Sequence, residues 1–522
     1  MSRRDGWRIV CSFSDLWPNA GACALVDGRQ VAIFRVGESV YAIDNFDPAS
    51  GANVLSRGIV GDVKGELVVA SPLYKHHYSL LTGRCLEDAA YSVNVYPVQI
   101  IDNRVAVNVQ SGHPAHRTGR RSLVVIGNGM AGMRTVEELL RLAPKKYDIA
   151  VFGAEPHPNY NRILLSPVLA GEKGVDEIVI HPPEWYAENG VALHSGDPVV
   201  EIDRRKRVVR SQKGVELRYD RLLIATGSKP IVLPIPGTNL PGVLTFRELA
   251  DVHAILARAR RERKAVVIGG GLLGLEAAYG LHRRGMHVTI VHLLETLMER
   301  QLDAVAGALL RASLESRGLK FRMPARTTEI FGDDHVRGVR FGDGSEIEAD
   351  LVVMATGVRP NIELAQRAGL RCDRGILVDD TMQTFDPSVY AVGECVQHRN
   401  STFGLVAPLW EQARVCAIHL AELGIARYAG TTPATQLKVT GIELYSAGDF
   451  RGDARAEAIV LRDPKRGVYK RLVIRDNKLR GAVLYGDASD GPWYFELINA
   501  GRDISALRDT LLFGPALARS GS

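Results

Sequence analysis

The clearest pattern in the chain is an apolar run that leads at once into a glycine turn and then a helical period. Residues 123–126 are all apolar, which predicts a buried strand, and apolar residues then recur every three or four positions up to residue 140. The glycines of the turn are Gly127, Gly129 and Gly132. The first permits a tight turn, the second admits a pyrophosphate to the backbone, and the third lets helix and strand pack closely. We predict a dinucleotide site at the helix N-terminus.

The same pattern recurs at residues 264–293, where strand, glycine turn and helical period again follow one another. The glycines of this second turn are Gly269, Gly271 and Gly274. Each copy is followed by an apolar run that ends in Ala-Thr-Gly, with Thr226 and Gly227 after the first copy and Thr356 and Gly357 after the second. Chance is the alternative in a chain with 52 glycines, but the strand and helix context favours two dinucleotide sites in one enzyme.

The regions on either side of these two units are rich in predicted strands. Residues 1–110 contain short alternating runs separated by turn signals, which predicts an all-β domain. Residues 111–120 are polar, contain glycine and proline, and predict a linker. Residues 431–513 again favour short strands, with a helical stretch at their end, and residues 514–522 form a tail.

Composition narrows the class of protein. The hydrophobic share of 46% and the charged share of 24% are typical of soluble globular proteins, and a net charge of +6 is too small to indicate nucleic-acid binding. The N-terminus lacks the apolar core of a signal peptide, and no apolar run suits a membrane span, so we expect a cytoplasmic protein with no membrane partner. The six cysteines form no Cys-x-x-Cys pair and no metal-ligand spacing.

Two segments of the first domain point to a known family. NFDPASGANVLSRG and SPLYKHHYSLLTGRCLED resemble the two ligand loops of a Rieske domain, of the small-subunit type found in assimilatory NAD(P)H-dependent nitrite reductases. A Rieske centre needs two cysteines and two histidines. The four ligand positions here correspond to Asn45, Asp47, Ser71 and Tyr74. We therefore expect a Rieske-like domain without a cluster or any metal, which leaves docking or assembly as its task; His76 and His77 are the alternative ligands.

The rest of the chain resembles the N-terminal flavoprotein part of the large subunit of the same reductases. The resemblance is carried by NYNRILLSPVLAGE, QTFDPSVYAVGECV and APLWEQARVCAIHLAE, beside the two glycine turns. It implies a multidomain α/β flavoprotein with two Rossmann-type dinucleotide-binding domains and a small α+β C-terminal domain. The FAD domain is expected in two pieces, residues 121–242 and 366–430, with the NAD(P)H domain, residues 243–365, inserted between them. Residues 431–513 resemble the C-terminal domain of rubredoxin and nitrite reductases.

The resemblance also implies which residues hold the flavin. Glu155 lies about where this fold places an acidic residue that accepts hydrogen bonds from a ribose, with a solvated loop carboxylate as the alternative. Glu394, after Gly393, occupies the position that bonds the ribityl chain in similar reductases, most of which carry Asp outside the nitrite reductase group. Leu409 and Trp410 lie in the helix from Ala407 that would bring backbone amides and an aromatic ring to the isoalloxazine; for Trp410 a place in the core is the alternative.

Two residues are singled out on the nicotinamide side. Glu276 either favours the positive end of its helix or, by resemblance, lies beside the nicotinamide. His292 ends a strand where an NAD-selective site usually carries Asp or Glu, and Glu295 follows three residues later. No arginine is adjacent to His292 to bind a 2′-phosphate, so the sequence predicts NAD(P)H, with NADH slightly preferred by resemblance.

The segment after the first unit argues against a thiol acceptor. Residues 160–166 read YNRILLS, without the cysteine that coenzyme A disulfide reductases and NADH oxidases carry here, and Arg162 within them is expected to contact the flavin cofactor. The segment resembles reductases that pass single electrons to a metal–sulfur protein. Pro167 stands where those reductases often carry lysine, so we assign no role to a lysine.

These resemblances predict an FAD-dependent NAD(P)H oxidoreductase that passes electrons to a separate nitrite or nitrate reductase component or another iron–sulfur acceptor. The cysteine-rich and sirohaem regions of the large subunit do not follow residue 522, so neither an iron–sulfur cluster nor sirohaem is expected in this chain. A homodimer is possible by resemblance. The alternatives are a ferredoxin or rubredoxin reductase of another pathway, and a flavin-loaded assembly or sensor protein.

Overall fold

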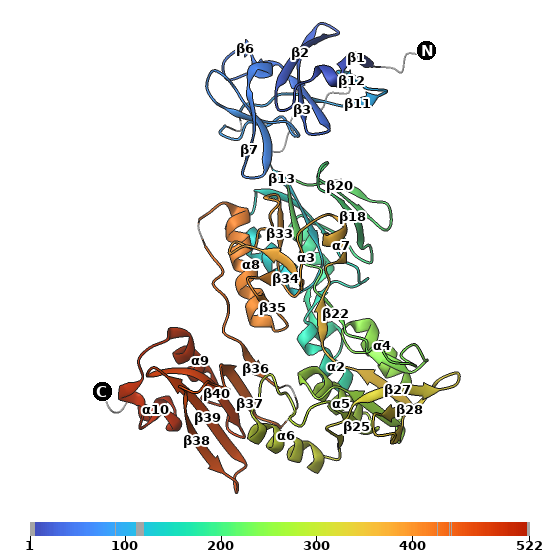
Figure 1. Ribbon diagram of the computed structural model, residues 1–522, viewed down its shortest axis with the longest axis vertical. Coiled ribbons are helices and arrows are strands. Elements are labelled where there is room, and N and C mark those ends of the chain that lie inside the picture. The colour runs from blue at the N-terminus through green and yellow to red at the C-terminus, as the bar shows by residue number, and fades with distance from the viewer. Residues whose placement is uncertain are drawn as a thin grey trace.

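The computed structural model describes residues 6–88, 90–110, 120–424, 426–437, 439 and 441–518. The molecule is elongated, with an N-terminal β domain at one end, a first α/β unit in the middle, and a second α/β unit beside a C-terminal unit at the other end (Figure 1). Most of the predicted linker, residues 111–119, lies outside the described residues.

The N-terminal domain is all-β, as its alternating runs predict. Its strands form three small antiparallel sheets around two apolar clusters. The sheets are β1 (Trp7–Ser12), β12 (Arg104–Asn108) and β11 (Val98–Ile101); β10 (Val95–Tyr96), β4 (Ser39–Asp44), β3 (Arg29–Val36) and β2 (Gly21–Val26); and β7 (Ile59–Val63), β8 (Glu66–Ala70) and β9 (His77–Ser79). A short pair, β5 (Phe46–Asp47) and β6 (Ala52–Asn53), carries part of the first ligand-like loop.

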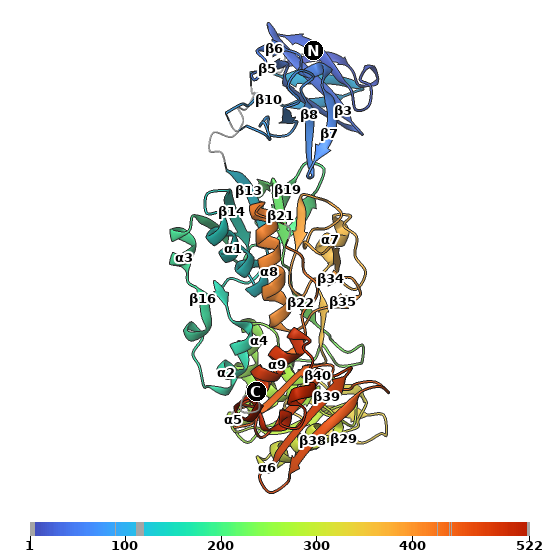
Figure 2. The same cartoon turned by 90° about the vertical axis from the view of Figure 1, so that its left-hand side faces the viewer.

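The first α/β unit is built on a parallel sheet whose strands are continuous apolar runs, because both faces are covered. Its order is β17 (Val191–His194), β14 (Tyr147–Phe152), β13 (Arg121–Ile126), β21 (Arg221–Ile224) and β33 (Val389–Ala391). Helix α1 (Met130–Leu142) follows the first glycine turn and packs along α8 (Val406–Ala421) (Figure 2). Strand β33 and helix α8 follow the second unit in sequence, so the first unit is formed from two separate chain segments.

The second α/β unit repeats this design. Its parallel sheet has the order β23 (Val243–Thr245), β30 (Leu351–Met354), β24 (Lys264–Ile268), β25 (His287–Val291) and β26 (Lys320–Arg322). Helices α5 (Leu272–Arg283) and α6 (Ala304–Ser316) cover the sheet, and β27 (Thr327–Gly332), β28 (Val336–Phe341) and β29 (Glu346–Glu348) form an added antiparallel sheet. The two α/β units are joined by an antiparallel pair, β22 (Ser228–Pro230) with β31 (Val358–Pro360).

The C-terminal unit is a five-stranded antiparallel sheet with helix α9 (Gly491–Ala500) on one face. The strand order is β36 (Ala434–Gln436), β37 (Leu444–Gly448), β40 (Lys478–Tyr485), β39 (Val468–Arg475) and β38 (Glu457–Asp463). Its other face shares an apolar cluster with α6 of the second α/β unit. The predicted tail begins with the short helix α10 (Pro515–Ala518).

One short helix departs from the division expected from the sequence. Helix α2 (Leu165–Ala170) lies in the segment assigned to the FAD domain, yet it packs on α5 of the second unit. A Cβ at Gly280 of α5 would lie 2.9 Å from Cγ of Leu169, so the glycine lets the two helices approach closely. The YNRILLS segment therefore bridges the two units. The exact domain boundaries remain predictions.

The N-terminal domain contacts the first α/β unit through the hairpin of β7 and β8. At its tip the backbone oxygen of Lys64 accepts a hydrogen bond from Arg221 at 3.4 Å, and that of Gly65 accepts one from Arg207. Gly65 has φ +82°, and a Cβ there would overlap Pro387. The tip thus fits against the loop before β33 with no room for a side chain.

Replacing Gly65 with valine should weaken this contact between the domains. Overpacking at a close contact typically costs about 1–3 kcal/mol. We expect faster amide hydrogen exchange at residues 64–66 and 385–388 in the variant. Gly28→Val is the matched control, because Gly28 also has φ +82° but nothing lies within 4 Å of its Cβ position. Equal exchange at 385–388 in both variants would show that the hairpin tip does not hold the domains together.

Candidate active site

A cavity of about 1350 Å³ lies between the two α/β units and is lined by both glycine turns. Three residues of β36 in the C-terminal unit, Ala434, Thr435 and Gln436, also line it. Most of the predicted site residues lie along its wall: Gly127, Gly129, Glu155, Arg162, Thr226, Gly227, Gly269, Gly271, Glu276, His292, Thr356, Gly357, Gly393, Glu394 and Leu409. Gly132, Gly274 and Trp410 are not part of this lining.

The first glycine turn has the geometry that its spacing predicts. Gly127 has φ +118°, and a Cβ there would overlap the backbone oxygen of Ala225. The Cβ position of Gly129 has no atom within 4 Å, so the space above the helix N-terminus is open. At Gly132 a Cβ would lie 2.6 Å from the backbone oxygen of Gly127. The third glycine therefore serves the packing of helix on strand, which explains why it lies off the cavity wall.

The second turn repeats the first residue by residue. Gly269 has φ +130° and a Cβ there would overlap the oxygen of Ala355, Gly271 faces open space, and a Cβ at Gly274 would overlap the oxygen of Gly269. Each turn thus leaves backbone amides and empty volume at a helix N-terminus, the arrangement that binds a pyrophosphate. Arg247 also lines the cavity, and its buried Nε has no hydrogen-bond partner among the described residues. These features fit two dinucleotides.

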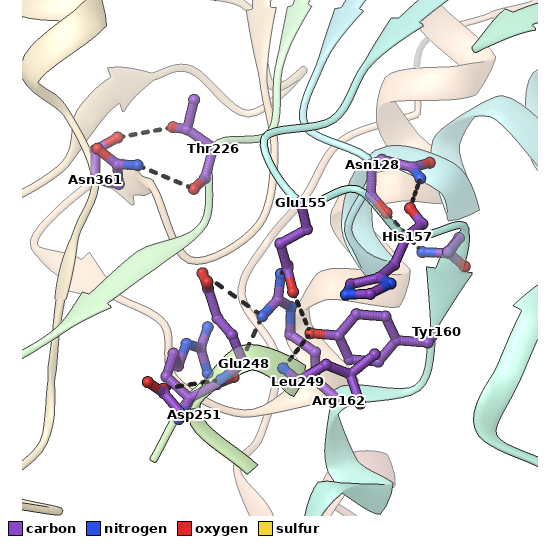
Figure 3. A network of polar contacts seen from close by, with 12 residues as sticks. Asn128, Glu155, His157, Tyr160, Arg162, Thr226, Glu248, Leu249, Asp251 and Asn361 are labelled. Carbon is purple, nitrogen blue, oxygen red and sulfur yellow. Dashed lines mark hydrogen bonds and ion pairs between the residues drawn. The ribbon is translucent and has the colours of Figure 1, made fainter. Parts of the chain in front are cut away.

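The two Ala-Thr-Gly motifs fasten the strands that connect the units. The Thr226 hydroxyl donates to the backbone oxygen of Asn361 at 2.7 Å, and the Asn361 amide donates back to the oxygen of Thr226 at 3.3 Å (Figure 3). The Thr356 hydroxyl donates to the oxygen of Ile231 at 2.7 Å. Asn361 lines the cavity but was missed in the sequence, where the run Arg-Pro-Asn after the second motif was the available signal.

Glu155 belongs to a polar network at the first dinucleotide site. Its carboxylate accepts hydrogen bonds from Arg162 and, at 2.8 Å, from the Tyr160 hydroxyl (Figure 3). Burial raises the pKa of Tyr160, which keeps the phenol neutral as a donor. Glu248 lies 4.0 Å from Arg162, and burial followed by the charge of Glu155 raises the pKa of Glu248. Glu155 is therefore a partly buried, hydrogen-bonded carboxylate at the cavity wall, unlike a solvated loop residue.

Glu394 lies at the wall between the units. Its carboxylate accepts a hydrogen bond from the Ser228 hydroxyl at 2.7 Å and forms an ion pair with Arg247. Gly393 precedes it with φ +91°, and its amide donates to Gln412 of α8 at 2.8 Å. Gln412, which is fully buried, thus ties this turn to the helix that carries Leu409.

Trp410 is not among the residues that line the cavity, and its place beside the isoalloxazine stays a prediction. Its side chain is 36% exposed, so the alternative of a core residue is wrong, and Arg134 of α1 lies over its ring with the guanidinium carbon 5.8 Å from the ring centroid. The preceding residue, Leu409, is buried and lines the cavity. Consecutive residues of one helix point in different directions, so this helix can present only one of the two to the cavity.

Glu276 and His292 line the second site. Glu276 is buried in the second turn of α5 and accepts a hydrogen bond from Ser166 at 2.5 Å. Nδ1 of His292 accepts a hydrogen bond from the amide of Gly270 at 3.1 Å, so its Nε2 carries the proton toward the oxygen of Thr296 at 3.1 Å. The carboxylate of Glu299 lies 3.4 Å from the same Nε2. His292 therefore braces the second glycine turn.

Two of the four Rieske ligand positions, Asp47 and Ser71, are joined by a hydrogen bond, whereas Asn45 and Tyr74 have separate surroundings. The buried Asp47 carboxylate accepts hydrogen bonds from Ser71 and Tyr78, each at 2.6 Å. Burial opposes ionisation, but these hydrogen bonds outweigh it and lower the pKa of Asp47. Asn45 accepts from the amide of Ser56 at 2.8 Å and donates to Gln30 at 3.0 Å. Tyr74 is 66% exposed.

The alternative histidine ligands do not complete a metal site. His77 pairs with Glu87 at 2.5 Å, and His76 packs near Tyr91 with ring centroids 5.8 Å apart. Across the described part of the chain no group of three or more His, Cys, Asp or Glu side chains is placed to hold a metal ion. The residues present supply no thiolate at the ligand positions and do not fit a [2Fe–2S] cluster.

Three families match the chain in the order of its domains. Residues 6–108 match the Rieske-like [2Fe-2S] domain, residues 121–417 the pyridine nucleotide-disulphide oxidoreductases, and residues 433–502 the C-terminal domain of rubredoxin NAD+ reductase. The predicted fold class is confirmed. In addition, no helix among the described residues is long and apolar enough to cross a bilayer.

The resemblance to nitrite reductases is also confirmed. The Bacillus subtilis (strain 168) nitrite reductase [NAD(P)H] is 48% identical over 404 residues, which is 77% of this chain and 50% of that protein. The assimilatory nitrate reductase electron transfer subunit of the same organism is 44% identical over 393 residues, 75% of this chain and 51% of that protein. The chain thus spans about half the length of these two relatives.

Solved reductases share the architecture. The covalent putidaredoxin reductase–putidaredoxin complex matches with a TM-score of 0.68 and 26% identity over 73% of this chain and 94% of that chain. The NADH:rubredoxin oxidoreductase of Clostridium acetobutylicum matches with a TM-score of 0.62 and 26% identity over 74% and 97% of the two chains. With two matched glycine turns on one cavity, and a match over residues 121–417, the chain belongs to the pyridine nucleotide-disulphide oxidoreductase family and is an NAD(P)H oxidoreductase.

Proposed function

We propose that this chain is the FAD-dependent electron-transfer component of nitrite or nitrate reduction, and that it delivers electrons from NAD(P)H to a separate metal-centre protein. The observation that carries the proposal is the single cavity on which two equivalent glycine turns open. The cytoplasmic location expected from the sequence stays a prediction.

The first turn is proposed to hold FAD and the second NAD(P)H. A flavin held there would accept an electron pair from reduced nicotinamide and could release electrons singly, while the protein would supply binding and orientation. In this assignment Glu155 and Arg162 lie at the FAD nucleotide, Glu394 lies toward the ribityl chain, and Glu276, held by Ser166, lies beside the nicotinamide. No general acid–base pair is needed for transfer between the two rings.

The cysteines support a metal-centre acceptor over a thiol acceptor. None of the residues that line the cavity in the described chain is a cysteine. Cys395, next to Glu394, is fully buried, and burial raises its pKa to about 11. A thiol with this pKa stays protonated at neutral pH and is a poor nucleophile. Electrons from the flavin therefore have no thiol relay in this cavity.

The N-terminal domain is proposed to lack an iron–sulfur cluster and to serve docking or assembly. Asp47 and Ser71, at two of the ligand positions, are hydrogen-bonded to each other, and the Tyr78 hydroxyl donates to the same carboxylate. Burying a carboxylate costs little free energy when several hydrogen bonds are donated to it, whereas burying an unpaired carboxylate is strongly unfavourable. The proposed partner is a separate nitrite or nitrate reductase component; dimer formation remains a further proposal.

A ferredoxin or rubredoxin reductase of another pathway is the second candidate. It is favoured by the match of residues 433–502 to the rubredoxin NAD+ reductase C-terminal domain and by a rubredoxin-NAD(+) reductase of Ectopseudomonas oleovorans, 34% identical over 60% of this chain and 81% of that protein. The rates at which this protein reduces a rubredoxin and a nitrite reductase metal-centre component can be compared. A rubredoxin rate equal to the other would favour this candidate.

The purified yellow protein should be bleached rapidly by NAD(P)H under anaerobic conditions and should reduce ferricyanide, without stoichiometric iron in the same sample. Stopped-flow absorbance and iron analysis test the two halves of the proposal separately. Slow bleaching with no ferricyanide reduction would contradict the active-site assignment. Stoichiometric iron would contradict the cluster-free N-terminal domain.

Gly129→Val and Gly271→Val should separate the two dinucleotide sites. Both glycines have extended backbone, with φ −85° and −83°, and open space at the Cβ position, so valine fits the protein but fills the volume proposed for a pyrophosphate. We expect Gly129→Val to weaken FAD retention, and Gly271→Val to raise the KM for NAD(P)H about tenfold or more, equivalent to about 1.4 kcal/mol, with FAD retained. Each variant is the control for the other. Equal loss of FAD in both would contradict the assignment of the two turns.

A further inference from the structure

We infer that the second dinucleotide site accepts the 2′-phosphate of NADPH, with Arg326 and Arg300 as its cationic partners. The inference rests on the proposed function in one respect, the assignment of NAD(P)H to the second glycine turn. Neither arginine is adjacent to His292 in the sequence: Arg300 lies eight residues after it and Arg326 thirty-four.

Three chain segments meet at the place where this fold holds the adenosine ribose, which is the end of the second strand of the unit. His292 follows that strand, β25, and accepts the hydrogen bond from Gly270 in the turn. The amide of Met298 donates to the oxygen of Gly270 at 3.0 Å, which brings the segment with Arg300 to the turn. The amide of Ala325 donates to the oxygen of His292 at 2.8 Å, which places Arg326 directly after a residue bonded to His292.

The carboxylates at this position are poorly placed to select NADH. An NAD-selective site uses an acidic side chain to bind the ribose hydroxyl that carries the phosphate in NADPH. Glu295 is exposed and is not among the residues that line the cavity. Glu299 does line the cavity, with its carboxylate 3.4 Å from Nε2 of His292. The strand end itself therefore carries His292 in place of the acidic side chain.

The two guanidinium groups, by contrast, are available. Arg300 and Arg326 are exposed and line the cavity, and their guanidinium groups have no hydrogen-bond or ion-pair partner among the described residues. The nearby Arg322 is instead paired with Asp343. Guanidinium groups bind phosphate through paired N–H donors, and they do so most strongly where no carboxylate competes.

A third group points to the same ligand chemistry. Thr327 follows Arg326, is only 8% exposed and lines the cavity, yet its hydroxyl has no hydrogen-bond partner within the described chain. Buried polar groups are normally paired, so an orphaned hydroxyl at a cavity wall indicates a ligand or water that completes it. The hydroxyl oxygen is closed to solvent in this structure, so a phosphate oxygen beside Arg326 would reach it after a rotation of the Thr327 side chain.

The test compares binding of 2′,5′-ADP with binding of 5′-AMP to the FAD-loaded full chain, by titration calorimetry. The two probes differ by the 2′-phosphate. We expect 2′,5′-ADP to bind at least about tenfold more tightly, with an advantage that falls as salt rises. Arg326→Ala and Arg300→Ala should each remove most of this advantage and leave 5′-AMP binding unchanged. Arg337→Ala is the control, since Arg337 is an exposed residue of the same unit outside the cavity lining.

The kinetic readout is the ratio of kcat/KM for NADPH to that for NADH, which should fall about tenfold in Arg326→Ala and stay constant in Arg337→Ala. Equal affinity of the two probes in the unmodified chain, or an advantage that survives both cavity variants, would overturn the inference. If neither nucleotide reduces the flavin while 2′,5′-ADP still binds more tightly, the proposed function fails and the phosphate site stands.

Discussion

The close approach of a helix to the first strand of each α/β unit is the constraint on which the rest of the site depends. At Gly132 a Cβ would lie 2.6 Å from the oxygen of Gly127 and 3.0 Å from Cβ of Ala225, and at Gly274 it would overlap the oxygen of Gly269. Any larger side chain would push the helix away from its turn. Because the helix N-termini then could not face the cavity, both proposed pyrophosphate sites depend on these two positions, although neither touches the cavity itself.

The two sites are held in a fixed relation by the strands that join the units. Thr226 bonds Asn361, and Thr356 bonds Ile231, so each Ala-Thr-Gly motif is fastened to the connection that leaves the other unit. Between them, β22 and β31 pair in antiparallel fashion. Helix α2 adds a third link, because it leaves the first unit and packs on α5 of the second. The separation of two bound dinucleotides would therefore be set by short-range hydrogen bonds and packing, with little freedom for the units to move apart.

The sequence predicts the repeated parts of this structure well, because each depends on residues that are close together along the chain. Gly127, Gly129 and Gly132 mark a turn that a strand precedes and a helix follows. The same pattern at residues 264–293 supports this interpretation. What it could not predict depends on contacts between distant segments. Arg326 is brought to the end of β25 by the backbone hydrogen bond from Ala325 to His292, and Asn361 reaches Thr226 across the unit boundary. The outward position of Trp410 depends on the register of α8 on α1, which a helical period does not fix.

The N-terminal domain shows how a fold can persist when its usual ligand set is absent. In a Rieske centre the metal would hold the two ligand loops together. Here Asp47, on the first loop, accepts hydrogen bonds from Ser71 and Tyr78 of the second, so a buried carboxylate joins the same two loops. The hydrogen bonds that lower the pKa of Asp47 also offset the cost of burying its charge. The loops are thus cross-linked without a metal, while the opposite side of the domain, through the hairpin tip at Gly65, is fitted to the flavoprotein part. Internal hydrogen bonds hold the shape of this domain, and a close backbone contact holds its position. The domain therefore presents a fixed surface beside the reductase in both redox states of the flavoprotein part, which supports a docking role.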